Sequence, residues 1–321
     1  MTGVHHVEVK NRDARFKFDL YRNITVVRGN SGTGKTTLFE MIADYTRLKE
    51  ASGVNLSCDK DCVALTDTDW KNQLSGVTDS IVFIDEGAVY LRSKDFAKAI
   101  KRTDNYYVIF SRENLHELPY SVEEIYEIRA SGKFHSFKKM YRSEKHIYYK
   151  DGSRSKPKPD APFHALLTED SRSGYRFYCA FFRDDGVECH TSGSNSAIFH
   201  WLNEHRDEKV FVIADGAAFG SEIDRILKLR SAENFRLCLP ESFEWLILKS
   251  GLIKTEDIAD LLDRPSDFIE SADFFSWENF FEKYLTDHTV GTPFQYSKSE
   301  LNPTYLNRAN AERIIGEIFQ N

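Results

Sequence analysis

The residues with the most specific chemistry lie near the start of the chain, in the run Gly29-Asn30-Ser31-Gly32-Thr33-Gly34-Lys35-Thr36. This run fits the pattern G-x-x-x-x-G-K-S/T in full. Glycines let the backbone curl, so that successive N–H groups point at phosphate oxygens. Lys35 is expected to reach the β- and γ-phosphates of a nucleotide, and the Thr36 hydroxyl to bind Mg²⁺. We include the next residue, Thr37, among the candidate nucleotide-binding residues; the alternative interpretation is a chance glycine-rich turn.

A second run with matching chemistry is a hydrophobic stretch that ends in two acids, Ser80-Ile81-Val82-Phe83-Ile84-Asp85-Glu86. Asp85, at the end of such a strand, is expected to bind Mg²⁺ directly or through water. Glu86 can orient and polarise the attacking water, which makes it a candidate catalytic residue. The alternative is an acidic pair that only caps the start of a helix. Together the two runs predict ATP and Mg²⁺ as cofactors.

A parallel sheet is needed to bring these residues together. The motif requires a strand before it, expected at Asn23–Arg28, and an amphipathic helix after it, expected at Thr36–Arg47. Further strands are expected at Val4–Val9, Arg15–Leu20, Cys62–Leu65, Ser80–Ile84, Tyr106–Phe110 and Ile125–Ile128, with a helix over Phe96–Ile100. Strands that alternate with helices predict an α/β fold with a parallel sheet covered by helices.

The chain of 321 residues is long enough for two domains. Its composition changes at Asp151–Pro162, where Gly, Ser, Lys and three prolines occur together, as is typical of a linker. We therefore expect an ATPase domain over residues 1–150 and a linker over residues 151–162. A second α/β domain is expected over residues 163–250, followed by a helical C-terminal extension over residues 251–321.

The second half repeats the alternation, and acids follow three of its expected strands. The strands are expected at Ala165–Thr168, Val187–His190, Val210–Ala214 and Arg236–Leu239, with helices at Gly174–Phe182, Ala197–Glu204 and Glu222–Leu229. The acids are Glu169, Asp215 and Glu241, with Glu244 one helical turn later. Carboxylates gathered at one sheet edge suit Mg²⁺ or Mn²⁺ and can support phosphodiester cleavage. Alternatively, these acids only cap helices.

The first half resembles the ABC-type ATPases, including their DNA-repair and phage-defence branches. The phrase Ile24-Thr25-Val26-Val27-Arg28-Gly29-Asn30-Ser31-Gly32-Thr33-Gly34-Lys35-Thr36-Thr37-Leu38 is similar to the opening of that family. In that family an acid after the magnesium aspartate activates water, and Glu86 matches it. Ser111 and Arg112 stand where the family has its switch histidine. The helical arm with its Ser-Gly-Gly signature is missing, because Leu74-Ser75-Gly76 lies too near Asp85. Because this arm is missing, we expect slow or partner-dependent hydrolysis.

The second half resembles the Toprim domain of topoisomerases, primases and overcoming-lysogenization-defect nucleases. Glu169 matches the glutamate that ends the first strand of that family, and Thr191-Ser192-Gly193-Ser194 its glycine-bearing loop. Asp215-Gly216-Ala217 stands where the family has Asp-x-Asp, so the second acid is absent, and Glu222 or Asp224 is a candidate substitute. The resemblance implies a metal-dependent nuclease, with Glu169 and Asp215 as metal ligands and Glu241 or Glu244 beside them.

Two hypotheses follow from these resemblances. In the first, the protein is an ATP-gated nuclease of bacterial anti-phage defence that cuts DNA or RNA. In the second, the Toprim-like domain is catalytically inactive and serves as a docking surface, and ATP binding controls assembly with a partner protein or further copies of the chain. A small-molecule P-loop kinase is a weaker third interpretation, because Asp85-Glu86 suits water activation better.

Composition narrows the possible partners and location. The net charge of −7 argues against an overall basic, nucleic-acid-binding surface. The basic stretch Lys133–Lys158 is either a solvated hinge or a strip that faces nucleic acid. No window approaches the roughly 18 apolar residues that span a bilayer, and Met1–Lys10 lacks the apolar stretch that is typical of a signal peptide. The five cysteines are too scattered for a disulfide framework. We expect a cytoplasmic protein with no membrane partner.

Overall fold

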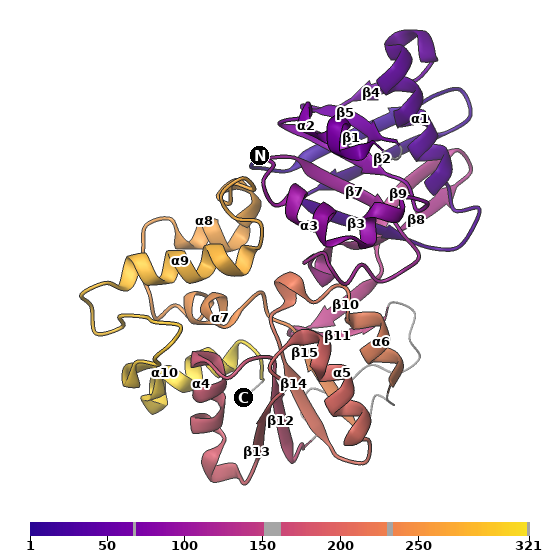
Figure 1. The fold of residues 1–321 in the computed structure, drawn as a ribbon. Helices are drawn as coiled ribbons and strands as arrows, with labels where there is room; N and C mark the ends of the chain where they lie inside the picture. The colour runs from indigo at the N-terminus through magenta and orange to yellow at the C-terminus, as the bar shows by residue number, and fades with distance from the viewer. Residues whose placement is uncertain (67–68, 151–161, 230–233, 320–321) are drawn as a thin grey trace. The chain divides into compact units, whose positions relative to one another are not determined.

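Two β-sheets organise the computed structural model, each in its own part of the chain (Figure 1). The structure describes residues 1–66, 69–150, 162–229 and 234–319. Unit 1 contains Met1–Met140 and Arg264–Phe275, and unit 2 contains Tyr141–Asp263 and Ser276–Asn321. The division after Met140 differs from the expected one at residue 150, and the expected C-terminal extension is shared between the units. The expected linker lies outside the described residues, except for Pro162.

The sheet of unit 1 has nine strands in the order β4-β1-β2-β9-β8-β3-β7-β6-β5. The strands are β1 (His5–Lys10), β2 (Arg15–Leu20), β3 (Ile24–Arg28), β4 (Asn55–Ser57), β5 (Asp61–Leu65), β6 (Ser80–Ile84), β7 (Tyr106–Phe110), β8 (Ile125–Ser131) and β9 (Phe134–Lys139). Its helices are α1 (Lys35–Leu48), α2 (Trp70–Ser75) and α3 (Lys94–Ile100). Neighbouring strands from β8 to β5 are parallel, whereas β1 pairs antiparallel with β2 and β4.

The central strands of unit 1 are buried along their whole length. Every residue of β3, β6 and β7 is buried, as continuous β-branched and aromatic runs predict for parallel strands covered on both faces. Helix α1 buries Leu38, Met41 and Ile42 in the hydrophobic core of the sheet. Each such side chain contributes about 1.5–3 kcal/mol when fully buried. The core therefore fixes the strand ends from which the loop residues emerge.

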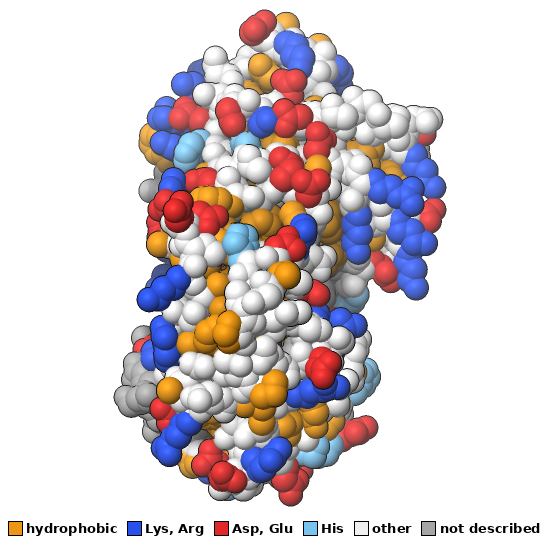
Figure 2. Space-filling model, turned by 90° about the vertical axis from the view of Figure 1, so that its left-hand side faces the viewer, with side chains coloured by type: hydrophobic (Ala, Val, Ile, Leu, Met, Phe, Trp, Pro, Cys, Tyr) orange, Lys and Arg blue, Asp and Glu red, His pale blue; other side chains and the backbone are white. Residues whose placement is uncertain are grey.

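The expected strands of unit 1 are confirmed at their positions, but the sheet is mixed and not purely parallel. β8 continues beyond Ile128, turns at Gly132 with a φ of +60°, and pairs antiparallel with β9. The stretch from Phe134 to Lys150 forms strands and is not a hinge. Charged residues alternate with aromatic ones in it, and this composition hid the strands. Figure 2 shows a dense group of Lys and Arg side chains at the right of the view.

Unit 2 contains a six-stranded sheet in the order β10-β11-β15-β14-β12-β13. The strands are β10 (Tyr141–Glu144), β11 (Ile147–Lys150), β12 (Ala165–Thr168), β13 (Glu188–Thr191), β14 (Val210–Ile213) and β15 (Phe235–Cys238). β12, β13, β14 and β15 are parallel to one another, and each matches an expected strand to within a residue at each end. β10 and β11, which the sequence did not reveal, extend the sheet in antiparallel fashion.

Seven helices belong to the described part of unit 2. They are α4 (Ser173–Phe181), α5 (Asn195–Glu204), α6 (Ile223–Leu229), α7 (Phe243–Lys249), α8 (Ile258–Asp263), α9 (Trp277–Thr289) and α10 (Arg308–Gly316). In Figure 1, α4 and α5 lie on opposite sides of the parallel strands, as the expected alternation of strands and helices requires. Across the described residues of the whole chain, no helix is both long enough and apolar enough to cross a membrane.

Candidate functional site

Three neighbouring parallel strands of unit 1 end at the same edge of the sheet. β7 lies between β3 and β6, with Phe110 paired to Val27 and Ile109 paired to Ile84. The residues that follow these strands are therefore close in space: Gly29 after β3, Asp85 and Glu86 after β6, and Ser111 and Arg112 after β7. Ligands of α/β proteins bind at this carboxyl edge of the strands. We call it the glycine-loop edge.

The loop from Gly29 to Lys35 has the backbone shape that its glycines allow. Gly29, Gly32 and Gly34 have φ values of +134°, +81° and +99°, a region that side chains with a Cβ rarely adopt. Helix α1 begins at Lys35, and no side chain caps its N-terminus. The first N–H groups of a helix are free to bind an anion unless a side chain caps them. The loop and the helix start together have the donors of a phosphate site.

The Lys35 ammonium lies against this loop. Its Nζ donates to the carbonyl oxygens of Gly29 at 2.6 Å and Asn30 at 3.0 Å, and it lies 3.8 Å from Oε2 of Glu86. Burial lowers the pKa of Lys35, while the nearby carboxylate of Glu86 opposes that shift. Thr36 and Thr37 are exposed on the first turn of α1.

The two acids after β6 differ in their surroundings. Oδ1 of Asp85 is buried and accepts no hydrogen bond within the described residues. Buried acceptors are nearly always satisfied, so this oxygen fits the role of a metal ligand. Glu86 instead accepts two hydrogen bonds from Arg112, from Nε at 3.1 Å and from Nη2 at 2.8 Å. Asp85 therefore offers an acceptor with no hydrogen bond in the described part of the chain, whereas the carboxylate of Glu86 is bonded to Arg112.

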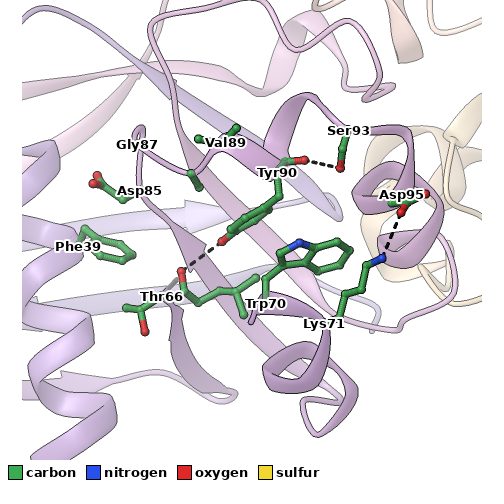
Figure 3. A pocket seen from close by; sticks show the side chains of 12 residues that line it. Phe39, Thr66, Trp70, Lys71, Asp85, Gly87, Val89, Tyr90, Ser93 and Asp95 are labelled. Atoms are coloured by element: carbon green, nitrogen blue, oxygen red, sulfur yellow. Dashed lines mark hydrogen bonds and ion pairs between the residues drawn. The ribbon is translucent and has the colours of Figure 1, made fainter. Parts of the chain in front are cut away.

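An aromatic-walled cavity of about 630 Å³ borders Asp85. Figure 3 shows Asp85 beside Phe39 of α1, and Trp70 and Tyr90 forming the facing wall. The Tyr90 hydroxyl donates to the carbonyl oxygen of Leu65 at 3.4 Å. No local sequence pattern predicts this cavity, because its lining comes from separate elements that the fold brings together.

A second cavity of unit 1, of about 640 Å³, lies between β2, β8 and β9 and is lined by Arg15, Arg129, Phe134 and His135, among others. It adjoins the glycine loop, since a Cβ on Gly34 would lie 3.3 Å from Cδ2 of His135. The His135 ring stacks on Phe16, and Phe134 is about half exposed at 52%. Aromatic faces and guanidinium groups therefore line the approach to the loop.

In unit 2, carboxylates from different elements meet in a small cavity of about 40 Å³. Glu169 and Asp215 follow the paired strands β12 and β14, and the Asp215 N–H donates to Oε2 of Glu169 at 3.4 Å. Glu244 of α7 is buried and accepts a hydrogen bond of 2.5 Å from the Tyr296 hydroxyl. These three predicted acids line the cavity together. We call it the carboxylate cavity.

A lysine from the C-terminal region also lines the carboxylate cavity. Lys298 is 15% exposed, and its Nζ lies 2.7 Å from Oε1 of Glu278 and 2.9 Å from Oε2 of Glu282. The hydroxyl of Tyr178, also in the lining, is buried and has no hydrogen-bond partner among the described residues. Neither residue could be predicted for this site, because no local pattern around Tyr178 or Lys298 indicates which strand ends it meets.

Burial and mutual repulsion raise the pKa values of the clustered acids. Burial, followed by repulsion from Glu278, raises the pKa of Glu169 to about 7. The same two causes raise the pKa of Asp215 well above its usual value, and Glu169 and Glu244 add to the shift. Burial also raises the pKa of Glu244, against the attraction of Lys298. Such a cluster favours a proton or another cation.

The remaining predicted acids lie apart from this lining. Glu241 is not among the residues that line the carboxylate cavity, so of the expected pair only Glu244 joins Glu169 and Asp215. Glu222 is paired with Arg225, and Asp224 with Lys228, so neither substitutes there for the missing second acid. Within the described residues, no group of three or more His, Cys, Asp or Glu side chains is positioned to hold a metal ion.

Comparison of the sequence with known proteins does not assign the chain to a family. No protein-family model matches the chain, and no curated protein has a matching sequence.

Proposed function

We propose that unit 1 binds Mg-ATP at the glycine-loop edge and hydrolyses it. The observation that carries this proposal is the meeting, at three adjacent strand ends, of a glycine loop, the buried ammonium of Lys35 and the acids Asp85 and Glu86. The loop amides and Lys35 supply positive potential for the β- and γ-phosphates. Thr36 and Asp85 would hold Mg²⁺, which shields phosphate charge when bound.

The residues then have distinct tasks in hydrolysis. A water oxygen attacks the γ-phosphorus, and the bond from that phosphorus to the β,γ-bridging oxygen breaks, so that ADP leaves with the bonding electrons. Glu86 orients the water and takes its proton. The cavity beside Gly34 offers aromatic and cationic groups, from Phe134, His135 and Arg15, for the nucleoside half.

The test is a comparison of the natural protein with Glu86→Gln. Glutamine keeps the size and polarity of the side chain but cannot take a proton as a carboxylate does. We expect Glu86→Gln to bind Mg-ATP normally. Its turnover rate should be lower by about 100-fold or more. Equal turnover in both proteins would remove Glu86 as the base. Absence of turnover in the natural protein would refute the ATPase itself.

We further propose that unit 2 is a metal-dependent nuclease whose activity depends on the nucleotide state of unit 1, in the manner of bacterial anti-phage systems. The observation in favour is the convergence of Glu169, Asp215 and Glu244 in one cavity with raised pKa values. Mg²⁺ or Mn²⁺ would relieve the repulsion between these carboxylates and activate water. DNA or RNA would be the substrate.

Cleavage of plasmid, linear DNA and RNA with Mg²⁺ or Mn²⁺ tests this second proposal, with and without ATP. The double variant Glu169→Ala plus Asp215→Ala should lose the activity, and equal cleavage by both proteins would identify a contaminant. No cleavage, combined with an ATP-dependent partner or oligomer in native mass spectrometry, would instead support the inactive docking domain. In that case Lys298 would be a permanent counter-ion of the cluster.

A further inference from the structure

The carboxylate of Glu86 is engaged by two cations at the glycine-loop edge. Arg112 donates to both of its oxygens, through Nε at 3.1 Å and Nη2 at 2.8 Å, and Lys35 lies 3.8 Å from Oε2. With one guanidinium bonded to both oxygens, fewer lone pairs of the Glu86 carboxylate are left to receive a water molecule. The pairing therefore opposes the task that the proposed ATPase assigns to Glu86.

Phosphate would compete for both cations. The fork of two N–H donors that binds a carboxylate also matches two oxygens of a phosphate group. Lys35 donates to loop carbonyls of Gly29 and Asn30, which phosphate oxygens would replace with charged acceptors. Arg112 follows β7, next to both the loop strand and the acid strand, so its side chain belongs to the same edge.

The ion pair is also weak enough to exchange. The Arg112 side chain is 51% exposed and that of Glu86 is 29% exposed, and ion pairs accessible to water contribute little to stability. Arg92 and Glu113 form a comparable exposed pair at 2.6 Å in the same unit, but that pair has no role in the proposed site. It provides a matched control.

We propose that Arg112 recognises the terminal phosphate of a bound nucleoside triphosphate. Its guanidinium exchanges the carboxylate of Glu86 for the γ-phosphate, which frees Glu86 to act as the general base. This inference rests on the proposed ATPase and adds a residue to it. A diphosphate lacks the γ-phosphate, so it leaves the Arg112–Glu86 pair intact. Arg112 thereby distinguishes ATP from ADP and links triphosphate binding to activation of water.

Calorimetric titration of the full chain with Mg-ADP and with a non-hydrolysable Mg-ATP analogue tests the inference. The proteins are the natural chain, Arg112→Ala, Arg112→Lys and the control Arg92→Ala. We expect Arg112→Ala to bind the triphosphate analogue about tenfold more weakly or worse, with unchanged affinity for ADP, because charged hydrogen bonds to one phosphate are lost. Arg112→Lys should recover part of the affinity, and Arg92→Ala should match the natural chain.

Turnover provides the second readout. Arg112→Ala should slow ATP hydrolysis although it frees Glu86, since the γ-phosphate loses its ligand. Unchanged triphosphate affinity and turnover in Arg112→Ala would overturn the inference and leave the ATPase proposal intact. Equal weakening for ADP and the triphosphate would also overturn it, by showing a general structural effect. If the natural chain binds neither nucleotide, the ATPase proposal fails and this inference fails with it.

Discussion

The glycine-loop edge of unit 1 and the carboxylate cavity of unit 2 occupy the same kind of place, the carboxyl ends of parallel strands, yet differ in electrostatic character. In unit 1, Lys35 and Arg112 lie beside the carboxylate of Glu86, and Asp85 precedes Glu86 after the same strand. In unit 2 they present Glu169 and Asp215, joined by other acids and by Lys298. The first site pairs cations with carboxylates beside a glycine loop, whereas the second gathers several carboxylates with one lysine.

The difference teaches that strand topology locates a site but does not determine its ligand. Both edges gather residues that are distant in sequence, as parallel strands generally do. The two sites differ in which charged groups they gather and in what satisfies those groups. At the glycine-loop edge the backbone contributes N–H donors as well, because three glycines adopt positive φ, whereas the carboxylate cavity depends on side chains.

The largest expected effect concerns the glycine-loop edge. Replacing Lys35 with alanine removes charged hydrogen bonds to two phosphates, each worth about 1.5–3 kcal/mol, so affinity for Mg-ATP should fall about 1,000-fold. Lys60→Ala is the control, since Lys60 pairs with Asp79 at the surface of the same unit. A fluorescent nucleotide titration measures both. Similar affinity in the two variants would show that the edge is not a phosphate site.

A smaller effect, on the free energy of unfolding, is expected from the carboxylate cavity when the pH changes. Because the pKa of Glu169 rises from the usual 4.5 to about 7, the folded chain holds this proton more tightly than the unfolded chain. Raising the pH through that window should therefore lower the free energy of unfolding of unit 2, by about 3 kcal/mol at most. Mg²⁺ should reverse the loss above neutral pH by binding the ionised cluster.

Denaturant unfolding of the natural chain and of Glu169→Gln, at about pH 5 and about pH 8, checks this expectation. The variant should depend less on pH and gain less from Mg²⁺, since glutamine does not ionise. Identical pH dependence in the two proteins would show that Glu169 carries no raised pKa. It would also remove the electrostatic contrast between the two sites.

The smallest expected effect tests how tightly the turn after β14 is packed. A Cβ on Gly216 would lie 2.8 Å from the Leu239 carbonyl oxygen and 2.9 Å from that of Pro240, and backbone atoms cannot move aside easily. We expect Gly216→Ala to destabilise unit 2 by about 2 kcal/mol. Gly316→Ala, which meets nothing within 4 Å, should change stability little. Equal thermal unfolding of the two variants would contradict this packing.

How much the sequence predicted depended on how local each signal was. The loop Gly29–Thr36 is contiguous and fits its pattern in full, and β3, β6 and β7 are mostly apolar runs, so the sequence was sufficient to predict them. β9, β10 and β11 were missed because they lie in a basic stretch that suggested a hinge or a strip facing nucleic acid. In unit 2, β12 and β14 are short, largely apolar runs between helical segments, and this alternation predicted the parallel strands.

Contacts between distant elements could not be read from the sequence. The pairing of Arg112 with Glu86 depends on β6 and β7 being neighbours, and neither residue has a local pattern that indicates the other. Lys298 reaches the acids of unit 2 through the fold of the C-terminal region. The choice of Glu244 over Glu241 depends on the orientation of α7, which spacing alone left open.

Calorimetric titration of the natural chain with Mg-ATP tests the central claim most directly, because it needs neither turnover nor a nucleic-acid substrate. The account predicts binding at one site, together with a rise in thermal stability that corresponds to about 2.7 kcal/mol when free nucleotide is 100 times the dissociation constant. No heat of binding and no thermal protection would contradict it.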